Sequence, residues 1–220
     1  AIFLSLQVGF WCALLGCPIA LFLGYVLGRK DFPGKSLLGT FLLAPMVLPP
    51  VAVGFLLLRF FSSSGGLGTW LTQWGISVPF SFLGAVISAI VVGIPLYIIS
   101  IRNAFELLDR RYEELALTLG LSPARVFLRV TLPLILPGIL AGALLAFARA
   151  LGEFGATAVL AGNIEGKTRT ISLALYTLLD APDGESHTQG LLIASLALAL
   201  AALLLFDVFS RWQKRRLEIL

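Results

Sequence analysis

Long runs of apolar residues alternate with short polar segments along the chain, and five of these runs are long enough to cross a lipid bilayer. A helix needs about 20 apolar residues to span the hydrocarbon core. The runs are continuous Leu, Ala, Val and Ile, without the period of two that the strands of a membrane β-barrel show. We therefore predict an all-α integral membrane protein with about five transmembrane helices. The predicted spans are Ile2–Gly28, Leu37–Phe61, Phe80–Ile101, Thr131–Leu151 and Gly190–Ser210.

The composition excludes an ordinary soluble domain. Of the 220 residues, 58% are hydrophobic and only 13% are charged, and the mean hydropathy is +0.96. So few charged residues cannot provide the polar surface that a soluble protein exposes to water. The net charge of +4 could suggest nucleic-acid binding, but the basic residues lie beside apolar spans, which is typical of membrane topology. We expect contact with membrane lipid and no nucleic-acid partner.

Basic residues gather in three of the segments that flank the spans, and this distribution predicts the orientation. Lys and Arg are enriched on the cytoplasmic side of membrane proteins. The segment 62–79 carries no charge and the segment 152–189 is mildly acidic, so we place both outside. The N-terminus should then lie outside and the C-terminus in the cytoplasm. Twelve of the 16 Lys and Arg residues lie on the predicted cytoplasmic side: Arg29, Lys30, Lys35, Arg102, Arg110, Arg111, Arg125, Arg129, Arg211, Lys214, Arg215 and Arg216.

Prolines and closely spaced glycines interrupt the predicted spans. An interior proline removes a backbone hydrogen bond and can kink a helix, while the pairs Gly24/Gly28 and Gly138/Gly142 allow helix backbones to approach closely. Both residue types are also simply common in membrane helices. Their accumulation in four spans favours a bent, tightly packed bundle that moves. The prolines are Pro18, Pro45, Pro49, Pro50, Pro95, Pro133 and Pro137.

The predicted cytoplasmic loop 102–130 has the pattern of a helical hairpin. Asp109 is a suitable N-cap, and Gly120 can adopt the left-handed conformation that ends a helix. Ser122 and Pro123 then provide the cap and first residue of a second helix. Glu113 and Glu114 lie off the apolar stripe of the first helix. That stripe consists of Tyr112, Leu115, Ala116 and Leu119.

This loop resembles the EAA loop of ABC-importer permeases. The sequence has Glu114-Leu115-Ala116, then Gly120, then Val130-Thr131-Leu132-Pro133, at the spacing of that motif. The resemblance implies that the helix docks in a cleft of a separate cytoplasmic ATPase dimer. The alternative is an ordinary interfacial helix with a chance Gly and Leu-Pro. The residues that the resemblance implicates in coupling are Glu113, Glu114, Leu115, Ala116, Gly120, Ser122, Pro123, Leu132 and Pro133.

Nearly the whole chain resembles the molybdate permeases of the ModB type, with the sulfate permeases as relatives. The run from Phe147 to Thr157 carries the resemblance most clearly, with Leu48-Pro49-Pro50 in the second span. The resemblance implies one type I permease domain over 1–220, with a coupling loop at 102–130 and an outer gate or re-entrant region at 152–189. It also implies a homodimer in the bacterial inner membrane, a periplasmic or lipid-anchored oxyanion-binding protein, and molybdate or tungstate as the substrate.

Arg149 and Glu153 are predicted to lie four residues apart on one helix face near the outer end of the fourth span. A charge there is costly unless it is paired or faces a cavity. The two side chains could line the translocation path, where Arg149 would attract a dianion weakly, or they could form a structural ion pair. Both interpretations stay open. The residues assigned to the path or gate are Pro49, Pro50, Arg149, Gly152, Glu153, Gly155 and Thr157.

No catalytic or cofactor-binding motif is evident. The chain has no GxxxxGK[ST] sequence, so ATP-Mg is expected on the partner ATPase, and this chain is expected to be a transport subunit rather than an enzyme. The single histidine, His187, has no Cys or carboxylate at ligand spacing, and no metal site is expected. Alternatives are a sulfate or thiosulfate permease and an ion-coupled secondary transporter, although intramembrane carboxylates that could relay ions are scarce.

Overall fold

The chain is described here by a computed structural model of residues 1–63, 66–179 and 184–218, without the side chains of 179, 184–187 and 213–218. Part of the predicted outer region, 180–183, and the side chain of His187 therefore lie outside the described residues. Every regular secondary-structure element in the described part is a helix.

Four helices are long and apolar enough to cross a membrane, and they correspond to the first, third, fourth and fifth predicted spans. They are α1 (Ile2–Arg29), α5 (Phe82–Leu107), the continuous helical segment Pro123–Leu151 that ends with α8 (Leu132–Leu151), and α11 (Gly184–Glu218), of which Thr188–Trp212 forms the candidate span.

The second predicted span is divided into two helices that together are long and apolar enough to cross a membrane, with a break sharper than a kink. Two helices, α2 (Lys35–Val47) and α3 (Pro50–Phe61), meet at an angle of 108°. Leu48 is extended because it precedes a proline, and Pro49, with ψ at 128°, also lies outside the helical region. Pro50 then begins α3 at a position where no N–H is needed. Single prolines elsewhere, such as Pro95 in α5, lie inside helices that continue, so the consecutive pair makes the difference.

Helices α1, α5 and α8 form the core of the bundle through close backbone approaches. A Cβ atom added to Gly24 of α1 would lie 2.6 Å from Ile101 of α5, and one added to Gly142 of α8 would lie 2.6 Å from Tyr97 of α5. Both distances are below any normal contact, so only glycine fits at these crossings. The close packing predicted from the glycine pairs is thus present for Gly24 and Gly142, both against α5.

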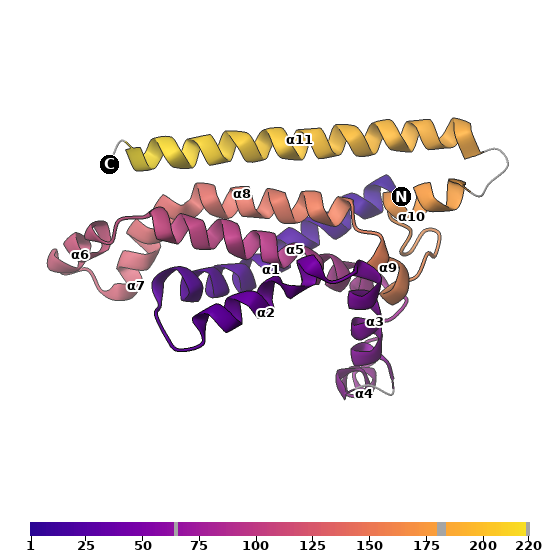
Figure 1. Ribbon diagram of the computed structural model, residues 1–220, viewed down its shortest axis with the longest axis horizontal. Helices are drawn as coiled ribbons and strands as arrows, with labels where there is room; N and C mark the ends of the chain where they lie inside the picture. Colours follow the sequence, from indigo (N-terminus) through magenta and orange to yellow (C-terminus); the bar gives the residue numbers. More distant parts are fainter. Residues whose placement is uncertain (64–65, 180–183, 219–220) are drawn as a thin grey trace.

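The elements divide between the two ends of the bundle (Figure 1). One end holds the α1–α2 connection, α6 (Arg111–Thr118), α7 (Pro123–Val126) and the C-terminal end of α11, whereas the N-terminus, α9 (Gly155–Leu160) and α10 (Ile171–Leu179) lie at the other. Helices α3 and α4 (Gly66–Gln73) project sideways. The three basic segments therefore share one end, as the topology prediction requires. Which side of a membrane that end faces stays a prediction.

Candidate functional site

The predicted helical hairpin is present at the basic end of the bundle. Helix α6 begins at Arg111, later than a cap at Asp109 would give, but the Asp109 carboxylate still accepts a hydrogen bond from the Arg111 N–H at 2.9 Å. Gly120 has a φ of +83° and reverses the chain, as predicted. Ser122 occupies the N-cap of α7, without a capping side-chain bond, and Pro123 is its first residue.

The apolar stripe predicted on α6 is divided between two sides of the helix. Ala116 is buried and Tyr112 is half-buried, whereas Leu115 and Leu119 are 61% and 84% exposed. The stripe therefore does not form one face, because part of it packs on the chain itself. Leu117 is also 45% exposed, but it lies on the other side of the helix, the side that carries Glu113. The outer side of α6 thus presents apolar side chains at the polar end of the bundle, which is typical of a docking surface.

The adjacent glutamates of α6 lie in different environments. Glu114 is exposed, while the Glu113 carboxylate accepts a hydrogen bond of 2.6 Å from the Thr131 hydroxyl and lies 3.5 Å from the Arg29 guanidinium. Residue type and spacing do not separate the two glutamates, and Arg29 was assigned only to topology. Thr131 lies within the motif Val130-Thr131-Leu132-Pro133, but its side-chain partner was not predicted.

A π-helical segment, η1 (Phe127–Thr131), joins the hairpin to α8. The Leu132 N–H bonds to the Phe127 carbonyl, five residues back. Pro133 follows, and its lack of an N–H removes the α-helical bond that would otherwise pair with Arg129. A wider turn at this point accommodates the missing bond. Leu132 and Pro133 therefore connect the hairpin directly to α8, as predicted.

A cavity of about 290 Å³ lies between the hairpin and the end of α1. Its lining combines the charged residues Arg29, Arg110 and Glu113 with the aromatic residues Tyr25 and Phe127 and the aliphatic residue Leu117. The rings of Tyr25 and Phe127 meet edge to face with their centroids 6.3 Å apart. This contact, the Arg29–Glu113 pair and a hydrogen bond of 3.3 Å from Arg110 Nη2 to the Arg29 carbonyl are the described links between α1 and the hairpin segment at this cavity.

At the opposite end of the bundle, Glu153 joins two helices. Helix α8 ends at Leu151, and Gly152 is its C-cap with a φ of −88°. Arg149 and Glu153 therefore do not share a helix face, contrary to the prediction. Their side chains still meet, because the chain turns at Gly152: Arg149 Nη1 lies 2.8 Å from one Glu153 oxygen, and the Ala156 N–H donates to the other at 2.8 Å. Glu153 is only 2% exposed.

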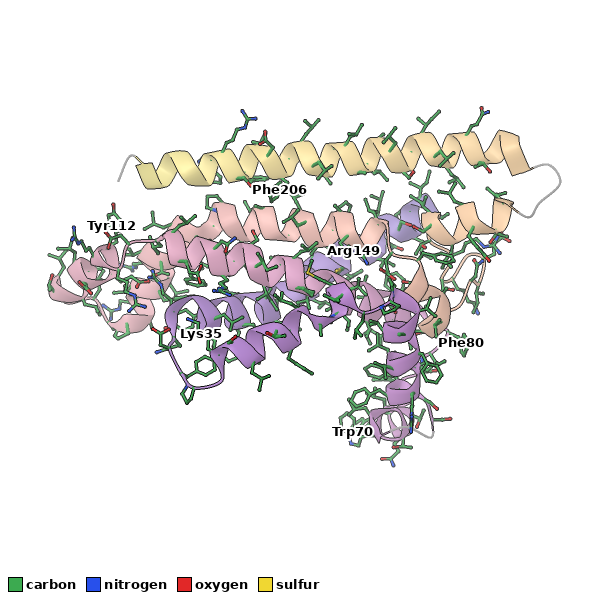
Figure 2. All side chains as sticks on the ribbon, in the orientation of Figure 1. Lys35, Trp70, Phe80, Tyr112, Arg149 and Phe206 are labelled. Atoms are coloured by element: carbon green, nitrogen blue, oxygen red, sulfur yellow. The ribbon has the colours of Figure 1, made fainter. Side chains whose placement is uncertain are left out.

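Helix α9, which begins after Glu153, packs tightly on α3. A Cβ atom added to Gly155 would lie 2.9 Å from Cβ of Pro50, and one added to Gly54 would lie 2.8 Å from Cα of Ala156. Thr157 is buried in the same helix. The structure thus brings together the assigned residues around Pro50, Gly155 and Glu153, with Pro49 adjacent in sequence. In Figure 2, Arg149 lies far from Tyr112 along the bundle.

Known proteins share both the sequence and the fold of this chain. A family model described as the binding-protein-dependent transport system inner membrane component matches residues 20–219. The molybdenum transport system permease protein ModB of Escherichia coli strain K12 is 47% identical over 217 residues, which are 98% of this chain and 95% of that protein. The sulfate transport system permease protein CysT of the same strain is 35% identical over 204 residues, covering 93% of this chain and 73% of that protein.

The fold is also found in a solved structure. A bacterial ABC transporter involved in the import of the acidic polysaccharide alginate matches with a TM-score of 0.68 at 20% identity, over 98% of this chain and 78% of that one. At this identity the likeness concerns the fold alone. It confirms the predicted all-α fold of an ABC-importer permease.

Proposed function

Because the chain belongs to the family of binding-protein-dependent transport system inner membrane components, we propose that it is the membrane-spanning permease subunit of an ATP-driven importer for molybdate in the bacterial inner membrane. The observation that carries the substrate class is the 47% identity to a molybdenum permease over nearly the full length of both chains. Tungstate is a second substrate of the same shape and charge. The subunit performs no chemistry itself, and ATP-Mg is bound and hydrolysed on a partner.

The partner ATPase dimer docks on the outer side of α6. Leu115 and Leu119 supply exposed apolar contact area there, and Glu114 adds an exposed charge beside them. An amphipathic helix that presents such a surface suits a groove on another protein. Gly120 sets the direction of this helix relative to α7, since its positive φ is strained for any residue with a side chain. Closure of the ATPase dimer then displaces α6.

The outer gate is formed where α8 ends and α9 packs against α3. Glu153 holds the first turn of α9 to Arg149, and the glycine contacts with Pro50 leave little room for independent movement of α3 and α9. Arg149 keeps a third of its side chain exposed. With its charge balanced by Glu153, it can attract a dianion without binding it tightly, which is what conduction requires.

A second copy of the chain completes the transporter. Homo-oligomers of soluble proteins favour closed two-fold symmetry, and we extend that preference to this chain. A path at the interface of two copies would place the gate residues beside α3, the helix that projects from the bundle. Exposed apolar residues of α3, among them Val51, Phe55 and Leu56, provide contact area for lipid or the second copy. A periplasmic or lipid-anchored binding protein delivers the oxyanion to the outer end, where α9 and α10 lie.

Sulfate import is the second candidate, because the sulfate permease CysT is also similar over most of this chain. The two functions are separated by reconstituting the permease with its ATPase and a candidate binding protein, and measuring ATP hydrolysis with each oxyanion. We expect stimulation by molybdate or tungstate with a molybdate-binding protein. Stimulation by sulfate alone would overturn the substrate assignment while leaving the permease assignment intact.

A further inference from the structure

The coupling hairpin contains a partly buried contact that is separate from its docking surface. Glu113 and Glu114 are consecutive, yet Glu114 is exposed and Glu113 is turned towards α1 and η1. A carboxylate that only solvated the helix or contacted the ATPase would have no need of these inner partners. Glu113 therefore has a function within the chain itself.

The contact of Glu113 with Thr131 is short and well protected. The hydroxyl donates to Glu113 Oε1 at 2.6 Å, and Thr131 is only 1% exposed. A hydroxyl bonded to a carboxylate is among the stronger hydrogen bonds in proteins, and a buried hydroxyl without an acceptor would be costly. This bond spans 18 residues of sequence. It joins α6 to the π segment that continues directly into α8.

The contact of Glu113 with Arg29 is different in kind. Arg29 Nη2 lies 3.5 Å from the same Oε1 atom, and its Nε and Nη2 atoms make no hydrogen bond in the described structure although the side chain is 8% exposed. A hydrogen bond weakens steeply with distance and angle, whereas the attraction between two charges falls only as the inverse of their separation. The Glu113–Arg29 link can therefore lengthen at modest cost, and the cavity beside Arg29 gives the side chain room to follow. The bond from Arg110 to the Arg29 carbonyl is exposed and long, at 3.3 Å, so water can replace it when the hairpin moves.

From this difference we infer that Glu113 is a positioning residue that, with Thr131, makes α6, η1 and the start of α8 one rigid unit, while Arg29 guides the movement of that unit along α1. Displacement of α6 by the ATPase is then transmitted to α8 rather than absorbed in the hairpin. This inference rests on the proposed function, since it takes the ATPase as the source of the displacement.

The test compares variants of Thr131 in the reconstituted complex of permease, ATPase and binding protein in liposomes. Thr131→Val keeps the shape and removes the hydroxyl, whereas Thr131→Ser keeps the hydroxyl. We expect the valine variant to co-purify with the ATPase and to lower the molybdate imported per ATP hydrolysed by about fivefold, the effect of losing one buried hydrogen bond. The serine variant and the control Glu106→Gln, which alters an exposed pair with Arg102, should match the wild type.

Two results would overturn the inference. An unchanged ratio of import to hydrolysis in Thr131→Val, even with both rates reduced, would show that the bond is merely structural. Failure of Glu113→Gln to co-purify with the ATPase would place Glu113 on the docking surface instead. If the wild-type complex imports no oxyanion, the proposed function fails.

A second measurement needs no substrate, so it tests the inference even if the wild-type complex imports no oxyanion. Spin labels are placed at the exposed positions Thr118 of α6 and Leu136 of α8, and their separation is measured in the complex with and without bound ATP. We expect one unchanged distance in the wild type and a broadened or shifted distribution in Thr131→Val. A wild-type distance that changes with ATP would contradict the rigid unit.

Discussion

Replacing Glu153 should destabilise the protein far more than replacing an exposed glutamate with the same kind of partner. Glu153→Ala removes an ion pair with Arg149 at 2.8 Å and leaves the Ala156 N–H without its acceptor. The chain offers a matched control in Glu165, which also pairs with an arginine four residues away, Arg169 at 3.3 Å, but has a side chain that is 85% exposed.

The size of the effect follows from burial. Breaking a fully buried ion pair costs about 3–5 kcal/mol, and an orphaned buried N–H costs about 1–3 kcal/mol. Arg149 is a third exposed, so water offsets part of the cost of breaking the ion pair. We therefore expect Glu153→Ala to lower the free energy of unfolding by about 3 kcal/mol. For a chain of this size, that is a decrease in Tm of about 6–12 °C. Glu165→Ala should cost less than about 0.5 kcal/mol.

The assay is thermal unfolding of the purified variants in one detergent at one protein concentration. The double variant Arg149→Ala/Glu153→Ala should lose less than the sum of the two single variants, because no unpaired charge remains. Equal Tm decreases for Glu153→Ala and Glu165→Ala would refute the reasoning. If Glu153→Ala is as stable as the wild type but imports less molybdate, the pair belongs to the path and has no structural role.

Three further predictions concern packing, docking and topology. Gly142→Ala should lower Tm because its Cβ would meet Tyr97 at 2.6 Å, whereas Gly39→Ala, with open space around it, should not; unfolding of the two variants checks this, and equal effects would contradict it. Leu119→Asp should abolish co-purification with the ATPase without changing Tm, because this side chain is 84% exposed. Reporter fusions should place the N-terminus outside and the C-terminus in the cytoplasm, and the reverse result would contradict the charge argument.

The fold was largely predictable because lipid allows few solutions. Long apolar runs in a bilayer must be helices, and the hairpin residues Gly120, Ser122 and Pro123 each act locally, so their positions could be predicted from residue type. The second span was predicted from its length and hydropathy, but the sharp break within it was not. The effect of Pro49 and Pro50 together, a bend of 108°, depends on how α3 packs against α9, which the sequence does not display.

The candidate sites were only partly predictable. The spacing of Arg149 and Glu153 left an ion pair as one of two open interpretations, and the structure contains that pair. The end of α8 at Leu151 and the bond to Ala156 were missed, because both depend on where the chain turns. Glu113 and Glu114 could not be told apart, since their environments are decided by contacts with segments far away in sequence. Local patterns predict helices and caps, whereas buried polar partners follow from the tertiary arrangement.

The central claim is that this chain imports an oxyanion only when an ATPase is docked on α6. The most direct measurement is uptake of molybdate into liposomes that contain the permease–ATPase complex, with a molybdate-binding protein outside and ATP available to the ATPase. The account predicts uptake that requires ATP and that Leu119→Asp abolishes. Uptake that continues without ATP, or in the Leu119→Asp variant, would contradict it and would indicate a transporter that works alone.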